Sequence, residues 1–502
     1  MRQHGRSPGG RHRTWRIAHA RQRNAAARNQ VHGLVRTPLK ATGNLAAGAS
    51  PAAISRPHDR GLYSRQARCR ENALSPPERI QRDLYPDALR ALALLVVVFG
   101  HWFATLPRLD GGELVATDHL LHAWIPAAFL TWAVQVVPLF VFVSAAVSAD
   151  GVERRLHQGH SQFQWWGSRA LRLARPTVTY LAALTLLVIA ARFTGGRFLG
   201  TFDGSLTVHL WFLIMLLLVQ AMLPLSVAAD RRFGLRAVLG LIVLAAAFDI
   251  LRAGAFWPTQ WPTLGARVTG TDGGIGWLNA FAVWLLPQQL GIAWKRGRFR
   301  GAWTGLLLFT LGAAWLVGAV MSGYPVGMIG FDLAGNSNML PPTLALIGVI
   351  WLQVGLVLLC ERPARWLLDR ERLAGVVAFL GAFGMPLYLW HKLAELPAAW
   401  LGELIGAPID AGTPGDPGFW SGRLWWLGLC LLMVVPVLTI VAWIEMQRRK
   451  TVPHTESPRA VVVGGTALFA GLGCALVMGA VPGAIVGLVG VALASMFLRK
   501  SS

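Results

Sequence analysis

Long apolar segments recur from about residue 88 almost to the end of the chain, and short polar stretches separate them. Each has about the 20 residues that an α-helix needs to cross a bilayer. The composition, 54% hydrophobic and 14% charged with a mean hydropathy of +0.47, agrees with this pattern. The sequence therefore predicts an all-α fold, a polytopic transmembrane helical bundle. The predicted segments are 88–106, 125–148, 172–191, 208–228, 236–252, 275–294, 302–321, 342–360, 373–391, 424–445, 460–478 and 481–497.

The charges of the loops orient these twelve segments. Basic residues cluster after every second segment, whereas the intervening loops are richer in Gly, Pro and Trp. Because basic loops stay on the cytoplasmic side, this alternation predicts a multi-pass protein of the cell (inner) membrane with a cytoplasmic N-terminus. The basic loops contain Arg154, Arg155, Arg169, Arg172 and Arg175; Arg231, Arg232 and Arg236; Lys295, Arg296, Arg298 and Arg300; Arg362, Arg365, Arg370 and Arg372; and Arg448, Arg449 and Lys450.

The formal net charge of +23 does not indicate nucleic-acid binding. Residues 1–83 hold 17 Arg and Lys against 4 Asp and Glu, and the other basic residues lie in short loops. We expect residues 1–82 to form a disordered cytoplasmic tail, because the segment has no apolar run long enough for a signal peptide. Translation from a start codon near residue 80 is the alternative.

The remaining chain is predicted to have two parts. Residues 83–450 form a ten-helix core, and 451–502 form a C-terminal transmembrane hairpin. The hairpin is rich in Gly and Ala and contains Gly483-x-x-x-Gly487, a spacing that lets two helices approach closely. We expect it to pack against the core rather than to carry chemistry.

The first apolar segment carries two polar residues that call for an explanation. Arg90 lies at its start and His101 lies eleven residues later, about 16 Å along a helix axis. A charged residue near the middle of a membrane helix costs about 2.5–3.5 kcal/mol, so such residues commonly serve a function. Alternatively, Arg90 is an anchor at the membrane surface and His101 bonds to a neighbouring helix.

Five short motifs, in order, resemble the acyltransferase-3 family of integral membrane acyltransferases. The first is Arg90-x10-His101. The others are Val137-Pro-Leu-Phe-Val-Phe-Val-Ser144, Ser168-Arg-Ala-Leu-Arg-Leu-Ala-Arg-Pro176, His209-Leu-Trp-Phe-Leu213 and Met385-Pro-Leu-Tyr-Leu-Trp-His391. The second motif departs from the family pattern, because Ala145 replaces a glycine. The resemblance covers about residues 83–446, which are the ten helices of the family.

The resemblance implies transfer of an acyl group, often acetyl, from an acyl-CoA to an acceptor, with Arg90 and His101 as the catalytic pair. Acyl-CoA is then a donor substrate, and no bound cofactor is expected. Arg169, Arg172 and Arg175 lie at the predicted cytoplasmic face, where guanidinium groups suit the donor's phosphates. Their alternative role is to set the topology. His101 would act as a base on an acceptor hydroxyl or would carry the acyl group itself.

A second group of residues falls at or near the predicted outer side. We expect His209, Trp211, Tyr388, His391 and Ser144 to line the acceptor side, with interfacial anchoring and helix packing as the alternatives. The expected acceptor is a cell-surface glycan, a lipid or an exported small molecule. No acid is assigned to orient His101, since neither Asp249 nor Glu445 has an evident partner in the sequence.

Other functions remain as alternatives. The four cysteines are scattered and form no metal or disulfide motif, so no metal site is predicted. A twelve-helix secondary transporter fits the number of segments, although the chain lacks two similar halves. A structural or lipid-scrambling membrane protein is the third possibility.

Overall fold

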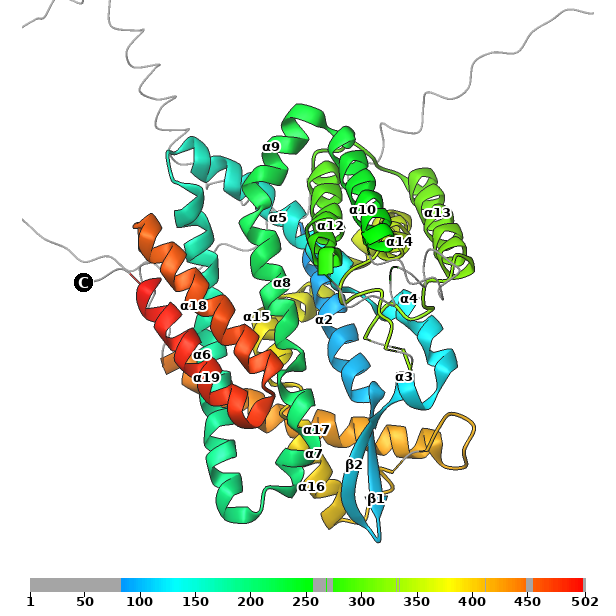
Figure 1. The fold of residues 1–502 in the computed structure, drawn as a ribbon, viewed down its shortest axis with the longest axis vertical. Coiled ribbons are helices and arrows are strands. Elements are labelled where there is room, and N and C mark those ends of the chain that lie inside the picture. The colour runs from blue at the N-terminus through cyan, green and yellow to red at the C-terminus, as the bar shows by residue number, and fades with distance from the viewer. Residues whose placement is uncertain are drawn as a thin grey trace, which may run out of the picture. The chain divides into compact units, whose positions relative to one another are not determined.

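The computed structural model describes residues 83–499, apart from 256–267, 269–273, 331, 334, 411 and 448–454. By its contacts the chain divides into Met1–Ile80 and Gln81–Ser502, and every described residue belongs to the second unit. The predicted tail, residues 1–82, lies outside the described residues. Most of the described chain is helical and only one short hairpin is strand, which confirms the all-α class (Figure 1).

The helices alternate with short connections along the described chain. Those of the first half are α2 (Leu84–Ala104), α3 (Leu120–Ala123), α4 (Thr131–Val134), α5 (Val137–His157), α6 (Gln162–Thr194), α7 (Arg197–Val208), α8 (Leu210–Ala221), α9 (Leu223–Phe233) and α10 (Leu235–Ala255), with a 3₁₀ helix at Ile125–Leu130. A second 3₁₀ helix, Gly274–Leu278, precedes α12 (Asn279–Lys295), α13 (Ala302–Met321), α14 (Leu346–Leu368), α15 (Glu371–Trp390), α16 (Glu395–Leu404), α17 (Phe419–Gln447), α18 (Pro458–Val477) and α19 (Ala480–Phe497).

The lengths and apolar composition of the helices confirm a multi-pass membrane protein. Within the described ranges, ten helical stretches are long and apolar enough to cross a bilayer, or up to eleven if the pair α9 and α10 counts as one span. That pair is bent by 117°. The number is lower than the twelve predicted for two reasons. Helix α12, in the predicted segment 275–294, has only 17 residues, and α10, in the predicted segment 236–252, counts as a span only together with α9.

Helix α2 lies in the middle of the bundle and joins two apolar clusters (Figure 1). Its residues Leu94, Val98 and Trp102 pack into a cluster with α6, α7, α8 and α15 to α19. Tyr85 and Leu89 pack into another cluster with α5, α10, α12 and α14. Burial of apolar side chains in two directions therefore holds α2 and its polar residues in the interior of the bundle.

The chain leaves α2 into a short hairpin that the sequence analysis did not predict. Strand β1 (Thr105–Asp110) pairs antiparallel with β2 (Glu113–His119), and Thr105 lies opposite His119. The turn is Gly111-Gly112, with φ values of 58° and 93°. Positive φ at both central residues is typical of a tight hairpin turn, and glycine adopts it without steric cost.

Polar contacts fix this hairpin to two helices. The Glu403 carboxylate on α16 accepts hydrogen bonds from the Leu114 amide (3.0 Å) and from the Arg197 guanidinium on α7 (2.6 Å). Arg197 also donates to the Leu114 carbonyl oxygen (3.1 Å), and Thr117 Oγ1 donates to the Thr201 carbonyl oxygen (3.1 Å). The hairpin is thus positioned by tertiary contacts as well as by its own pairing.

Small residues bring several helix pairs into backbone contact. In the C-terminal hairpin, a Cβ atom on Gly487 would lie 2.8 Å from Ala475 Cβ and 3.0 Å from the Gly471 oxygen. Between α18 and α19 the Gly-x-x-x-Gly spacing therefore acts as predicted. The hairpin packs against α6, and the Asp203 carboxylate of α7 accepts the Val481 amide hydrogen at the start of α19 (2.8 Å).

Candidate functional site

A cavity of about 810 Å³ lies beside α2, with walls from α5, α6, α8 and α15. Asp87, Arg90 and Arg169 line one end, which we call the arginine end. His101 and His119 line the opposite end, which we call the histidine end. Both members of the predicted pair, Arg90 and His101, thus face one space, and the step of eleven residues from one to the other spans about 16 Å of helix.

The arginine end brings together charges from α2 and α6. Arg90 Nη1 lies 3.5 Å from the Asp87 carboxylate one turn earlier on the same helix. The Arg169 guanidinium lies over the Trp165 ring, 5.2 Å from its centroid. Ser144, predicted from the second motif, lines the cavity as well. Two guanidinium groups beside one opening form a site suited to an anionic ligand.

The structure separates the three arginines that the sequence placed together. Arg169 and Leu173 line the cavity, because residues four apart lie on the same face of a helix. Arg172 and Arg175 are not on the cavity wall. Arg172 is exposed, and its Nε donates to the Ser168 carbonyl oxygen at 3.3 Å. The phosphate-binding prediction therefore rests on Arg169 and Arg90 rather than on all three residues of α6.

The histidine end is built from residues that lie 290 positions apart in the sequence. His101 Nδ1 lies 2.8 Å from His391 Nε2, at the end of α15. The two rings are stacked, with centroids 5.0 Å apart. The Trp102 indole donates to the His391 carbonyl oxygen at 2.9 Å, and His391 itself is fully buried. Two sequence motifs predicted separately therefore form one contact.

The hydrogen-bond network assigns the protons of these two rings. His391 Nδ1 lies 2.8 Å from the Tyr388 carbonyl oxygen, which can only accept, so this nitrogen carries the proton. In the neutral ring, His391 Nε2 is then an acceptor, and His101 Nδ1 must donate to it. Neutral His101 consequently keeps its lone pair on Nε2. That nitrogen is free to accept a proton from a molecule in the cavity.

Three other predicted residues surround the same end. His209 lines the cavity and is buried, and both of its ring nitrogens lack a hydrogen-bond partner among the described residues. Its ring contacts the His391 ring at 5.4 Å between centroids, and its carbonyl oxygen accepts from the Tyr388 hydroxyl. Trp211, two residues further along, lines the cavity and packs against Trp284. His209, Trp211 and Tyr388 therefore form part of the cavity wall around the histidine end.

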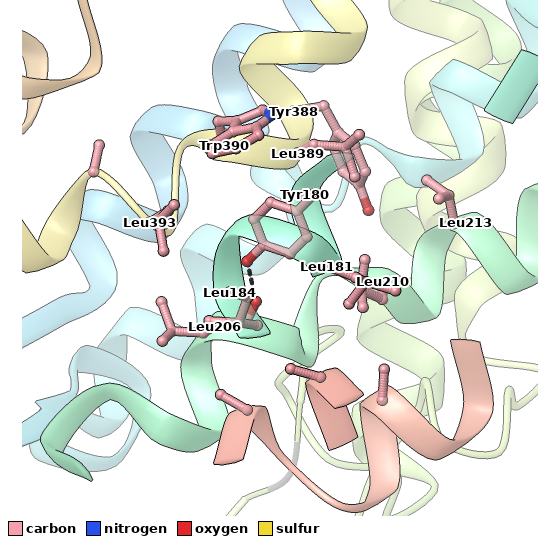
Figure 2. Packing of buried hydrophobic residues seen from close by; sticks show 14 of the residues in the cluster. Tyr180, Leu181, Leu184, Leu206, Leu210, Leu213, Tyr388, Leu389, Trp390 and Leu393 are labelled. Carbon is pink, nitrogen blue, oxygen red and sulfur yellow. Dashed lines mark hydrogen bonds between the residues drawn. The ribbon is translucent and has the colours of Figure 1, made fainter. Parts of the chain in front are cut away.

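Tyr388 also belongs to the packed layer behind this end. Figure 2 shows it beside Trp390 and Leu389, facing Tyr180 and Leu181 of α6. The Tyr180 hydroxyl donates to the Leu206 carbonyl oxygen at 2.5 Å. Because these large side chains are buried on all sides, they hold the end of α15 and with it His391 in a fixed position.

A buried ion pair next to the histidines was missed in the sequence analysis. Lys392 Nζ lies 2.7 Å from Glu395 Oε1 and 3.1 Å from Thr105 Oγ1, and both charged residues are buried. Burial raises the pKa of Glu395, and the charge of Lys392 opposes this effect. The signal was present, since Lys392 and Glu395 directly follow the Met385–His391 motif with the spacing of a helical pair.

The two acids considered in the sequence analysis do not take part. Asp249 is buried away from the cavity wall, where it accepts hydrogen bonds from Asn279 Nδ2 (2.8 Å), Tyr324 hydroxyl (3.0 Å) and the Leu344 amide (2.8 Å). It therefore has partners that the sequence did not reveal, and they join α10 to the chain on both sides of α13. The side chain of Glu445 lies outside the described residues. In the described ranges, no three His, Cys, Asp or Glu side chains are grouped to hold a metal ion.

Comparison with known proteins adds one finding to this geometry. Residues 83–444 match the acyltransferase-3 family model, whose description is "acyltransferase domain". The match begins at the residue before α2 and ends within α17, so it contains every residue discussed at the two ends of the cavity. No curated protein and no solved structure shows significant similarity.

Proposed function

Because the chain belongs to the acyltransferase-3 family, we propose that this membrane acyltransferase moves an acyl group from acyl-CoA to a hydroxyl of an acceptor. Acetyl is the first candidate for the acyl group. One observation carries the proposal: Arg90, Arg169 and His101 line a single cavity. Acyl-CoA has phosphates at one end and a thioester at the other, joined by a long flexible arm. A cavity with guanidinium groups at one end and an imidazole at the other suits such a molecule.

The arginine end would hold the donor. Its arginines would pair with phosphate oxygens, while the apolar walls between the two ends would accept the arm and the acyl chain. The basic loops predict that this end faces the cytoplasm, where acyl-CoA is made, and that the N-terminus is cytoplasmic. The membrane is then the cell (inner) membrane, and the histidine end opens toward the outer side.

The histidine end would carry the chemistry. In this mechanism, Nε2 of His101 removes the proton from the acceptor hydroxyl as its oxygen attacks the thioester carbonyl carbon. The imidazolium that forms is stabilised because His101 Nδ1 donates to His391 Nε2. When the tetrahedral intermediate collapses, the carbon–sulfur bond breaks and the sulfur takes the proton from His101. His391 is a positioning residue in this scheme, since it fixes the tautomer of His101.

The acceptor would approach from the histidine end. His209, Trp211 and Tyr388 lie there, with polar atoms and aromatic faces of the kind that contact sugars and amphipathic lipids. We therefore retain a cell-surface glycan, a lipid or an exported small molecule as the acceptor class. Membrane lipid surrounds the bundle in each case.

Purified full-length protein tests this proposal with labelled acetyl-CoA. We expect loss of the thioester and transfer of label to cell-envelope extract, and we expect His101→Ala to slow both about 10³-fold. Full activity in the His101→Ala variant would exclude the proposed base. The transporter alternative predicts instead that proteoliposomes take up a solute without any acyl donor, and that they leave acetyl-CoA intact.

A further inference from the structure

The β-hairpin returns the chain to the histidine end and delivers another imidazole there. His119 lies at the end of β2 and lines the same cavity as His101. Its strand partner is Thr105, four residues after His101, whose hydroxyl donates to the His101 carbonyl oxygen at 3.1 Å. Four residues rise about 6 Å along a helix, and opposite residues of an antiparallel pair lie about 4.5–5.5 Å apart. The register of the hairpin therefore brings His119 near His101.

Hydrogen bonding also assigns the proton of His119, which lies on Nε2, whereas the proton of His101 lies on Nδ1. His119 Nδ1 accepts a hydrogen bond from the Leu121 amide at 3.3 Å, so this nitrogen carries no proton. Although part of the side chain is exposed, contact with the surrounding protein, together with the charges of Lys392 and His122, lowers the pKa of His119 below its ordinary value. The ring is thus neutral near pH 7, and its proton lies on Nε2. The histidine end has one bare imidazole nitrogen and one imidazole N–H group.

Acyl transfer needs a donor of this kind. As the carbonyl carbon of the thioester is attacked, its oxygen gains negative charge, and a hydrogen-bond donor at that position accelerates the reaction. Neither Arg90 nor Arg169 can supply it, because both lie at the opposite end of the cavity. We propose that His119 is a catalytic residue that donates its Nε2–H to the thioester carbonyl oxygen in the transition state. This inference rests on the function proposed above.

The step balances without a further reactant. The acceptor proton moves to His101 Nε2, the new carbon–oxygen bond forms, and the carbonyl π electrons move to the oxygen that accepts the hydrogen bond from His119. His119 keeps its proton throughout. When the carbonyl double bond re-forms, the electrons of the carbon–sulfur bond leave with the sulfur, which is protonated by His101.

The hairpin is held where this role requires it. Arg197 and Glu403 bind Leu114 near the start of β2, and the Thr117 hydroxyl, two residues before His119, binds Thr201. A group that acts in the transition state must be fixed before the reaction, since reorganisation would cost part of the rate gain. His122 offers a natural contrast, because it lies three residues further on, with its ring 5.8 Å from that of His119, but does not line the cavity.

The test uses purified full-length protein, labelled acetyl-CoA, and both water and cell-envelope extract as acceptors. Three substitutions separate donor chemistry from ring packing. His119→Phe keeps the size of the ring but removes the donor. His119→Gln keeps an N–H group at the ε position, whereas His119→Asn places its N–H group closer to the backbone.

We expect His119→Phe to lower kcat about 10²-fold with an unchanged KM for acetyl-CoA. His119→Gln should recover much of the loss, His119→Asn should not, and His122→Phe should behave as the unsubstituted protein. Activity of His119→Phe equal to that of His122→Phe would overturn the inference. So would a loss confined to the KM for the acceptor, or a loss that His119→Gln shares in full. Unsubstituted protein that leaves acetyl-CoA intact would instead overturn the proposed function, and this inference with it.

Discussion

The arginine end and the histidine end of the cavity use polar residues in opposite ways. At the arginine end, Arg90 and Arg169 keep part of their surface exposed, and Arg90 pairs with Asp87 one turn away on its own helix. At the histidine end, His391 and His209 are buried, and the contacts join segments about 290 residues apart. At the first end each arginine contacts a neighbour on its own helix, whereas the second end depends on direct contacts between distant helices.

This difference suits the arginine end to ligand binding and the histidine end to the chemical step. Charged groups that water can reach attract an anionic ligand without the full cost of burying a charge. A base needs a defined tautomer and a fixed direction, and these come from buried hydrogen bonds. We therefore expect substitutions at the histidine end to change kcat and those at the arginine end to change the KM for the donor.

The largest effect is expected at His101. His101→Ala removes the only nitrogen positioned as a base in the proposed mechanism, so we expect kcat to fall about 10³-fold. Steady-state kinetics with labelled acetyl-CoA would measure it, and donor binding by equilibrium dialysis should be preserved. A loss of donor binding equal to that of an arginine substitution would erase the distinction between the two ends.

His391→Phe should have the next largest effect. Without His391 Nε2, nothing holds the proton on Nδ1 of His101, and part of the population then carries it on the catalytic nitrogen. We expect kcat to fall about 10²-fold while the KM for acetyl-CoA stays the same. A thermal unfolding curve serves as control, because His391 is buried. Unchanged kcat in a stable variant would contradict the assigned tautomer.

Arg169→Ala should have a smaller effect and a different one. Loss of one guanidinium contact to phosphate is expected to raise the KM for acetyl-CoA about tenfold, which corresponds to about 1.4 kcal/mol. Arg172→Ala is the matched control. Arg172 lies three residues after Arg169 and carries the same charge, but it is not on the cavity wall. Equal increases for the two variants would indicate a diffuse surface charge rather than a defined site.

The smallest effect is expected at the base of the hairpin. The hydrogen bond from Arg197, with that from the Leu114 amide, lowers the pKa of Glu403 below its usual value. Because the pKa of Glu403 is lower in the folded state, the ionised carboxylate stabilises the fold at pH values above the pKa of the unfolded state. This contribution is lost as the pH falls through the folded pKa, at pH values below about 4.3.

Glu403→Gln should therefore lower the melting temperature slightly at neutral pH and have little effect in acid. Unfolding curves collected across this pH range would show whether the gap between the two proteins closes. A gap that stays constant with pH would mean that the Glu403 carboxylate does not hold the hairpin through its charge.

Much of the membrane architecture was predictable because hydropathy is a local property. The predicted segments contain helices throughout the described ranges, and the motifs pointed to Arg90, His101 and His209, which line one cavity, and to His391, which contacts His101. The number of spans was less predictable. The 117° bend between α9 and α10 depends on packing as well as on apolar length.

Only part of the histidine end could be predicted from the sequence. The Asp110-Gly111-Gly112-Glu113 turn is a recognisable hairpin signal, yet it was not used. Even with it, the place of His119 depends on Glu403 and Arg197, which lie far along the chain. The spacing of Lys392 and Glu395 indicates a helical pair but not its burial, because two charges one helical turn apart are also typical of a solvated helix face.

By itself, the sequence determined that the chain is a membrane-embedded helical bundle and that α2 carries an arginine and a histidine about three turns apart. Local hydropathy is enough for the first conclusion, and spacing along one helix is enough for the second. Only the tertiary structure decided that Arg169 faces the cavity while Arg172 does not, and that the proton of His101 lies on Nδ1. The reason is physical: the direction of a side chain and the tautomer of a ring are set by the neighbours that pack against them, and those neighbours come from distant parts of the chain.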